Sequence, residues 1–286
     1  MTTKDRRISR RTVLGLLSAS TLGTIAADSF GFEPSWLETT RHDHHVDRLP
    51  AHLEGYLIAQ LTDIHLVTLN ALHTAIIEVI RREAPNLILL TGDIIESPEG
   101  LIALRTFLDA LRAPGRRMIA TIGNWERWGK VDLAALARTY QDGGAELLTN
   151  DRVLLESDLA LVTTDDSVLG FADLKAAMER GPTSARHQIL ATHAPGLLDT
   201  IIAPSSSVSS SSSSLPFILS LAGHTHGGQI RMGPYAPITP PGSGQYVSGL
   251  YNTRFGPMYV SRGIGTSVIP ARFFCRPELA LFRLRA

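Results

Sequence analysis

The sequence predicts an α/β protein built around a largely parallel sheet. Three observations support this fold class. Short apolar runs alternate with segments whose apolar residues recur every three to four positions, as in strands followed by helices. Hydrophobic residues fill 44% of the 286 positions, which is enough for a sizeable core. Polar residues follow the first three apolar runs at intervals of about 30 residues, the length of one βαβ unit.

The first half of the chain shows the clearest strand and helix pattern. It predicts strands at 56–65, 86–95 and 116–124, with helices at 70–84 and 100–113 between them. The continuous apolar runs in these strands are typical of parallel strands that are buried on both faces. An earlier stretch, "RHDHHVDRL", alternates in polarity and predicts an exposed first strand in preference to a metal site.

The second half is richer in strands and contains one clear helix at 173–180. Strands are predicted at 151–157, 159–166, 187–193, 217–223, 229–233, 258–263 and 279–285. The Ser-rich stretch at 205–214 cannot bury surface, so we expect a solvated loop there. Candidate site residues lie on both sides of this loop, which predicts a single domain over 56–286.

Residues 1–27 have the composition of an export signal. Five basic residues precede a mildly apolar run from Thr12 to Ala27, which is shorter than the ~20 residues that a membrane-spanning helix needs. Within this segment, "SRRTVLG" resembles the twin-arginine export signal. We therefore expect export by the twin-arginine machinery to a periplasmic or other extracytoplasmic location, with 28–55 as a linker and leading strand. An uncleaved signal would instead leave the protein attached to the membrane.

Charge and cysteine content limit the partners and the metal ligands. Acidic and basic residues balance at 27 each, so the chain lacks the positive surface of a nucleic-acid-binding protein, and no nucleic acid partner is expected. Cys275 is the only cysteine, which excludes an internal disulfide and a cysteine-based zinc site. Any metal must therefore be held by His, Asp, Glu or Asn.

Potential metal ligands follow five of the predicted strands. They are Asp63, His65, Asp93, Asn124, His193, His224 and His226. The carboxyl ends of parallel strands share one edge of a sheet, so we expect these side chains to converge there. Pairs two residues apart, such as His224 and His226, would lie on one face of an extended chain at ~6.6 Å spacing, which suits two metal ions ~3.5–4 Å apart. The simpler interpretation, capping aspartates and structural histidines, explains one such element but not five in order.

The motifs "TDIH", "TGD", "GNWE", "ATH" and "GHTH" resemble the ordered signature blocks of the calcineurin-like metallophosphoesterases. This resemblance implies a four-layer α-β-β-α sandwich of two mixed sheets flanked by helices. It also implies that Asp63, His65 and His226 hold one metal ion. A second ion would be held by Asn124, His193 and His224, with Asp93 bridging both.

The same resemblance implies a metal-dependent phosphohydrolase, and a phosphodiesterase or pyrophosphatase in preference to a monoesterase. Two divalent cations would lower the pKa of a bridging water and so produce a hydroxide that attacks phosphorus. Asp93, Asn124 and His193 are the implied catalytic residues. Mixed imidazole and carboxylate ligands favour Mn, Fe or Zn over Ca.

The C-terminal stretch "YVSRGIGTSVIPARFFCRPELALFRL" further resembles an exported bacterial subgroup of this family. Relatives in that subgroup include phosphodiesterases that act on UDP-diacylglucosamine-type lipids. A lipid-linked or nucleotide-containing phosphoester is therefore the expected substrate. Such UDP-lipids are expected on the cytoplasmic side of the membrane, whereas the signal directs this chain across it, so the physiological substrate stays open.

The sequence departs from the family pattern at Trp125, where most members have a histidine that helps the leaving group depart. An indole can donate a hydrogen bond but cannot act as a general acid, and loss of such an acid costs ~10²–10⁴ in rate. Either another group replaces it, or the substrate has a good leaving group and Trp125 lies in the substrate site, or Trp125 only packs. Arg262 would contact a substrate phosphate or pair with Glu278. Cys275 is expected to be buried packing.

Two other functions compete with hydrolysis of a phosphodiester. A non-catalytic metal-binding scaffold would be consistent with Trp125, although all seven expected ligands are present. An exported nuclease would share the metal ions but would need a basic groove with stacking aromatic residues, which the neutral overall charge disfavours.

Overall fold

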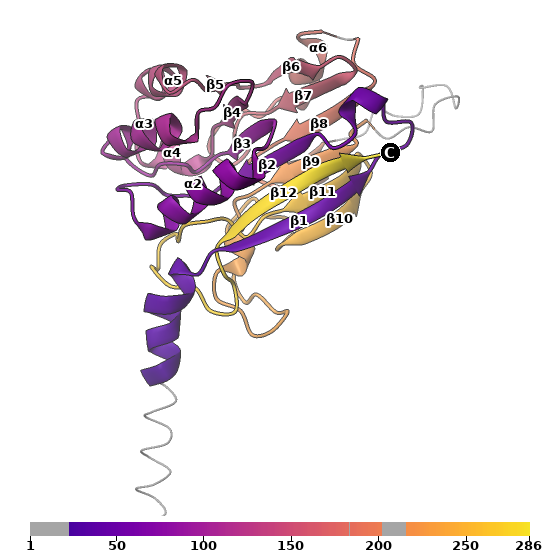
Figure 1. Ribbon diagram of the computed structural model, residues 1–286. Helices are drawn as coiled ribbons and strands as arrows, with labels where there is room; N and C mark the ends of the chain where they lie inside the picture. The colour runs from indigo at the N-terminus through magenta and orange to yellow at the C-terminus, as the bar shows by residue number, and fades with distance from the viewer. Residues whose placement is uncertain (1–22, 183, 202–215) are drawn as a thin grey trace, which may run out of the picture.

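The computed structural model describes residues 23–182, 184–201 and 216–286. Two six-stranded sheets pack face to face, which confirms the predicted α/β sandwich of two mixed sheets (Figure 1). The signal-like residues up to Leu22 and the Ser-rich stretch at 205–214 lie outside the described residues. Among the described residues, we find no helix with the length and apolar character needed to cross a membrane.

The first sheet has the strand order β1-β12-β2-β3-β4-β5. Its strands are β1 (Glu38–His45), β12 (Glu278–Arg285), β2 (Leu57–Leu61), β3 (Leu87–Thr91), β4 (Arg117–Thr121) and β5 (Glu146–Leu147). β2, β3, β4 and β5 are parallel, whereas β12 runs antiparallel to β2 and parallel to β1. The carboxyl ends of β2, β3 and β4 therefore meet at the edge where β1 and β12 begin.

The second sheet has the order β10-β11-β9-β8-β7-β6. Its strands are β10 (Gly249–Thr253), β11 (Gly256–Val260), β9 (Leu219–Ala222), β8 (His187–Ala191), β7 (Leu159–Thr163) and β6 (Asp151–Glu156). β7, β8, β9 and β11 are parallel, and the outer strands β6 and β10 are antiparallel to their neighbours. Most predicted strands are present, but the one predicted at 229–233 is wrong, because that stretch forms only isolated bridges such as Ile230 to Phe273.

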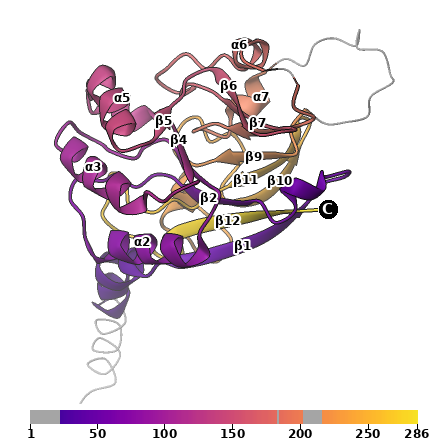
Figure 2. The same ribbon diagram turned by 45° about the horizontal axis from the view of Figure 1, so that its top comes forward.

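Helices cover the outer faces of both sheets (Figures 1 and 2). The helices are α2 (Ala71–Glu83), α3 (Gly100–Leu111), α4 (Asn124–Trp128), α5 (Leu133–Asp142), α6 (Leu174–Glu179) and α7 (Leu197–Thr200). A short π-helix forms at Asp28–Phe32, and single 3-10 turns form at Glu33–Ser35, Ala51–Leu53 and His226–Gly228. The segment expected as a linker before β1 is thus partly helical, and residues 23–27 continue this helix toward the N-terminus.

Three apolar cores follow from the alternation of side chains along strands that are buried on both faces. On β3, Ile88 and Leu90 pack with α2, α3 and α5, whereas Leu87 and Leu89 pack against the second sheet. A third core fills the space between the second sheet and α6 and α7. Two sheets held face to face in this way place the carboxyl edge of one beside that of the other.

Candidate metal centre

All seven residues predicted from the sequence lie just beyond strand ends at this shared edge. The strands concerned are β2, β3, β4, β8 and β9, which end two or three residues before the first ligand candidate. Six of the seven form two groups, and in each group the possible ligand atoms lie within 4.8 Å of one another. The first group is Asp63, His65 and His226, and the second is Asp93, His193 and His224.

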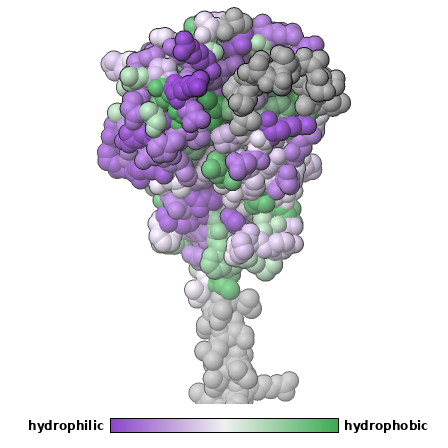
Figure 3. All heavy atoms as spheres, turned by 90° about the vertical axis from the view of Figure 1, so that its right-hand side faces the viewer, coloured by the Kyte–Doolittle hydropathy of each residue, from purple (hydrophilic) through white to green (hydrophobic). Residues whose placement is uncertain are grey.

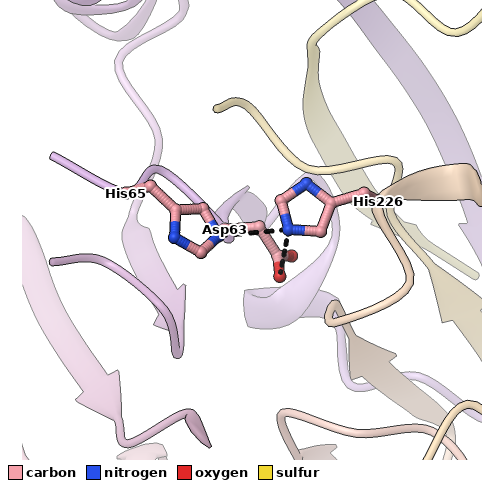
Figure 4. A group of neighbouring side chains, drawn as sticks. All are labelled: Asp63, His65 and His226. Atoms are coloured by element: carbon pink, nitrogen blue, oxygen red, sulfur yellow. Dashed lines mark hydrogen bonds and ion pairs between the residues drawn. The ribbon is translucent and has the colours of Figure 1, made fainter. Parts of the chain in front are cut away.

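The first group joins loops of both sheets (Figure 4). The Nε2 atoms of His65 and His226 lie 3.1 Å apart, and Oδ1 of Asp63 lies 3.6 Å from Nε2 of His226. The backbone N–H of His224 donates to both oxygens of Asp63, at 2.9 and 3.0 Å. This backbone donor therefore connects the first group to a member of the second.

His193 is the centre of the second group. Its Nε2 atom lies 3.2 Å from Oδ2 of Asp93, 3.0 Å from Oδ1 of Asn124 and 3.2 Å from Nδ1 of His224. Asn124, the seventh expected ligand, is therefore placed beside this group. Asp93 lies in the second group, and its other oxygen accepts the backbone N–H of Trp125 at 2.7 Å.

Five of these residues have backbones in the left-handed region, with φ between 50° and 71°: Asp63, His65, Asp93, His224 and His226. The expectation that His224 and His226 extend from a strand and share one face is therefore wrong, and the same holds for Asp63 and His65. β2 and β9 end before these pairs, and each pair lies in a tight loop. A non-glycine residue in this conformation costs roughly 1–3 kcal/mol, and such strain concentrates at functional sites.

Two glycines let the loops approach the carboxylates. A Cβ at Gly123 would collide with the Asp93 carboxylate, and one at Gly223 would collide with Asp63 and the Thr62 hydroxyl. The glycines that begin the "GNWE" and "GHTH" motifs thus have a steric role at the site.

Backbone carbonyls fix the ring protons of the second group. Nδ1 of His193 lies 2.9 Å from the Thr91 carbonyl, and Nε2 of His224 lies 2.7 Å from the Pro241 carbonyl. A carbonyl only accepts, so each of these nitrogens carries a proton. In the neutral rings, the lone pairs are left on Nε2 of His193 and Nδ1 of His224, which face each other and Asp93.

Burial and close charges shift the pKa values at the site. Burial acts to lower the pKa of His193, but the carboxylates of Asp93 and Asp63 outweigh burial and raise this pKa to about 10. Burial, followed by the charge of His193, lowers the pKa of His224 to about 4. Burial raises the pKa of Asp63. These opposite shifts are typical of charged groups crowded into a site without solvent.

The two groups suit divalent cations. Asp63 and Asp93 are buried, and in the part of the chain that the structure describes their ion-pair partners are histidines, with no Lys or Arg among them. Buried carboxylates need positive charge nearby, since an isolated one is too costly. Two cations, each beside one carboxylate and two imidazoles, would supply that charge and would replace the close contacts between ring nitrogens.

Sequence reasoning missed Glu126, which organises the loop that carries Asp93. The buried Glu126 carboxylate accepts backbone N–H groups of Asp93 at 3.1 Å, Ile94 at 2.7 Å and Gly123 at 2.9 Å. Burial, followed by the charge of Asp93, raises the pKa of Glu126 to about 7. Its position in the "GNWE" motif, three residues after a glycine that precedes a short helix, is the capping-box signal that would have indicated it.

Trp125 lies beside the first group. Its ring is 5.3 Å from the His65 ring at a right angle and 4.5 Å from the Trp128 ring. Trp128 is exposed, so the two indoles form a wall that runs from the centre to the surface.

The other candidates lie outside the two groups. Arg262 forms an ion pair with Glu278 at 3.3 Å and with Glu38 at 3.0 Å, which supports the predicted pairing with Glu278 over a contact with substrate phosphate. Cys275 is fully buried, as predicted. The histidines of "RHDHHVDRL" belong to β1, an edge strand, and no metal-binding group of described residues includes them.

Comparison with known proteins agrees with this geometry. The family model described as calcineurin-like phosphoesterase matches residues 56–228. The chain is 32% identical to the uncharacterized metallophosphoesterase YkuE of Bacillus subtilis, over 98% of this chain and 99% of the relative. It is 30% identical to the phosphodiesterase YaeI of Escherichia coli, over 97% of this chain and 99% of the relative. A third relative, the uncharacterized metallophosphoesterase YkoQ of Bacillus subtilis, is 24% identical over 83% of this chain.

Proposed function

This chain belongs to the calcineurin-like phosphoesterase family and is a metal-dependent phosphohydrolase, and on that premise we propose that it is a binuclear phosphodiesterase or pyrophosphatase. One observation carries the proposal. Seven nitrogen and oxygen ligand candidates from five strand ends converge in two adjacent groups. When bound, two divalent cations would activate a water molecule and neutralise phosphoryl oxygens.

The residues of the chain have distinct parts in this proposal. Asp63, His65 and His226 would hold one cation, and Asp93, Asn124, His193 and His224 would hold the other, with Asp93 also reaching toward the first. The Trp125 N–H fixes one oxygen of Asp93, and the Thr91 carbonyl fixes the His193 ring. Mn, Fe or Zn suits this mixture of imidazoles and carboxylates.

Trp125 favours a substrate with a good leaving group. The indole borders the first group, where it can contact a substrate but cannot protonate a departing oxygen. We therefore expect phosphoanhydrides and activated diesters to react faster than alkyl monoesters. The name of the relative YaeI, a phosphodiesterase, supports the preference for diesters.

The leaving-group preference is tested by Trp125→His on esters with graded leaving-group pKa. Restoring an acid should flatten the dependence of rate on leaving-group pKa, and the gain should fall within ~10²–10⁴ for the poorest leaving group. Trp128→His, a change in the exposed outer indole, is the matched control and should leave the dependence steep. Equal slopes in the native enzyme and in Trp125→His would refute this account.

The twin-arginine-like segment supports export and attachment at the membrane, so a phosphoester carried by a lipid or a nucleotide is the proposed substrate class. The proposal does not include nucleic acid, in keeping with the neutral charge.

Hydrolysis of bis(p-nitrophenyl) phosphate tests the enzyme as a whole. The expected result is turnover that depends on added Mn, Fe or Zn and falls at least ~10³-fold in Asp93→Asn, because one buried charge of the centre is lost. A panel of mono-, di- and pyrophosphoesters then ranks the substrates. A protein that binds two equivalents of metal but hydrolyses none of the panel would instead be the non-catalytic scaffold.

A further inference from the structure

Most of the exposed large apolar side chains lie at the same edge of the molecule as the metal centre. Three segments carry them, and we name their surface the apolar collar. Its members are Ile25, Phe30, Phe32, Trp36, Ile230, Met232, Tyr235, Ile238, Val268, Ile269 and Phe274. Hydrophobic side chains gather where the N-terminal helix joins the body (Figure 3). Exposed apolar patches of this kind mark a binding surface.

Hydrogen bonds join the three segments into one surface. The N–H of Arg272 donates to the Ser29 carbonyl at 2.9 Å, and the N–H of Phe274 donates to the Glu33 carboxylate at 2.9 Å. The N–H of Arg231 donates to the Phe273 carbonyl at 2.9 Å. The collar is therefore held in place by hydrogen bonds between its segments while its apolar side chains stay exposed.

Among the described residues, the opposite edge of the sandwich has no comparable surface. Within the described ranges, its connections at 46–56, 84–86, 112–116 and 156–158 contribute none of the exposed large apolar side chains. A general excess of surface apolar residues would have affected both edges. The collar is thus a property of the edge that carries the metal centre.

The charge of two of the three collar segments matches an anionic lipid surface. The stretches 229–246 and 263–277 contain no acidic residue, and each contributes a partly exposed arginine, Arg231 and Arg276. The N-terminal segment contains two acidic residues, the partly buried Asp28 and the buried Glu33. The Arg276 guanidinium lies 3.9 Å above the Trp36 ring. Exposed aromatic residues beside arginines are characteristic of the membrane interface, where the ring enters the headgroup layer and the cation meets phosphates.

The course of the chain identifies the occupant. The helix that leads into the collar projects away from the body (Figure 1), and the sequence before it contains an apolar run preceded by five basic residues. We propose that the collar docks the body of the protein onto an anionic lipid bilayer, so that the metal-bearing edge faces the headgroup layer. Phosphoesters of membrane lipids would then reach the centre without leaving the bilayer. This docking is independent of turnover, although the lipid substrate rests on the proposed function.

An environment-sensitive label on the full-length protein tests the docking. The label is attached through Val268→Cys or, as the control, through Ser157→Cys. Val268 is 82% exposed and lies in the collar, whereas Ser157 is exposed in the β6–β7 turn at the opposite edge. Each variant is labelled with the fluorophore NBD and mixed with phosphatidylcholine vesicles with and without phosphatidylglycerol. The native chain is the blank, because its single cysteine is buried. Circular dichroism and metal content confirm that each labelled protein is folded.

The expected result is a blue shift and a several-fold rise in emission at position 268 with the anionic vesicles, a smaller change without phosphatidylglycerol, and no change at position 157. No change at either position would overturn the proposal, even if the protein floats with the vesicles, because the N-terminal segment alone would then attach it. A shift at position 268 without vesicles that grows with protein concentration would also overturn it and would identify a second copy of the chain as the occupant. Neither readout depends on hydrolysis, so failure of the docking and failure of the proposed activity are distinguishable.

Discussion

The two groups of the metal centre differ in how their imidazoles are held. In the second group, the Thr91 and Pro241 carbonyls fix the rings of His193 and His224. In the first group, Nδ1 of His226 has no hydrogen-bond partner among the described residues. Nδ1 of His65 lies 3.4 Å from the partly exposed Glu96 carboxylate. The second group is therefore preorganised, and the first is less so.

This difference bears on how firmly each group keeps its metal. Partners that orient a ligating imidazole typically account for 10–100-fold in metal affinity. The second group has such partners on both rings, so it should bind the tighter ion. The first group should exchange its ion more easily, which makes it the group whose occupancy limits activity at low metal concentration.

The largest effects are expected from His193→Ala and His65→Ala, which should lose similar activity but retain different amounts of metal. Both should lower hydrolysis of bis(p-nitrophenyl) phosphate at least ~10³-fold, because two ions act together. After dialysis, His65→Ala should retain about one equivalent of metal at the intact second group. His193→Ala should retain less, because it removes the ring that contacts Asp93, Asn124 and His224. Elemental analysis measures the metal that each variant retains. If His193→Ala retained more metal than His65→Ala, the first group, and not the second, would be the tighter site.

Residue patterns predicted much of this centre but not its local geometry. Apolar runs and intervals of about 30 residues placed Asp63, Asp93 and Asn124 at one edge, because βαβ units repeat direction. No sequence pattern predicts the left-handed backbones of His65 and His226. A non-glycine residue keeps that conformation only where surrounding contacts hold it there. The extended geometry expected for these pairs failed for that reason.

The fold, too, was predicted only in part from residue patterns. Periodicity predicted the buried strands but could not assign them to two sheets. The expectation of two sheets came from the resemblance to a family. The capping-box pattern marks Glu126 as the cap of a short helix, but its role at the centre was overlooked because the N–H groups of Asp93 and Ile94 that it accepts lie more than 30 residues away in sequence. The sequence left open whether Arg262 contacts a substrate phosphate or pairs with Glu278. Only the fold shows that both Glu38 and Glu278 lie beside it.

A smaller effect is expected from pH, and it isolates the second group. The pKa of His193 is raised to about 10 without metal, so below that pH the ring carries a proton that a cation must displace. In His65→Ala, the affinity for the remaining ion should therefore rise about tenfold per pH unit between about pH 7 and 10, and then level off. Competition with a chelator of known affinity measures this. A profile that is flat across that range would contradict the link between Asp93 and His193.

The smallest effects come from two carboxylates outside the groups. Glu126→Gln replaces one of two oxygens that accept backbone N–H groups from Asp93, Ile94 and Gly123, so an amide N–H would face a backbone donor. It should weaken the second ion about 10–100-fold and cost about 1–3 kcal/mol of stability. Glu96→Gln is the matched control at the first group, where the side chain is 34% exposed and lies 3.4 Å from His65, so solvent already screens the contact. Isothermal titration and thermal melts of both variants measure the two effects. A loss in Glu96→Gln as large as in Glu126→Gln would mean that the first group depends on its carboxylate as much as the second does, and that the two groups are equally preorganised.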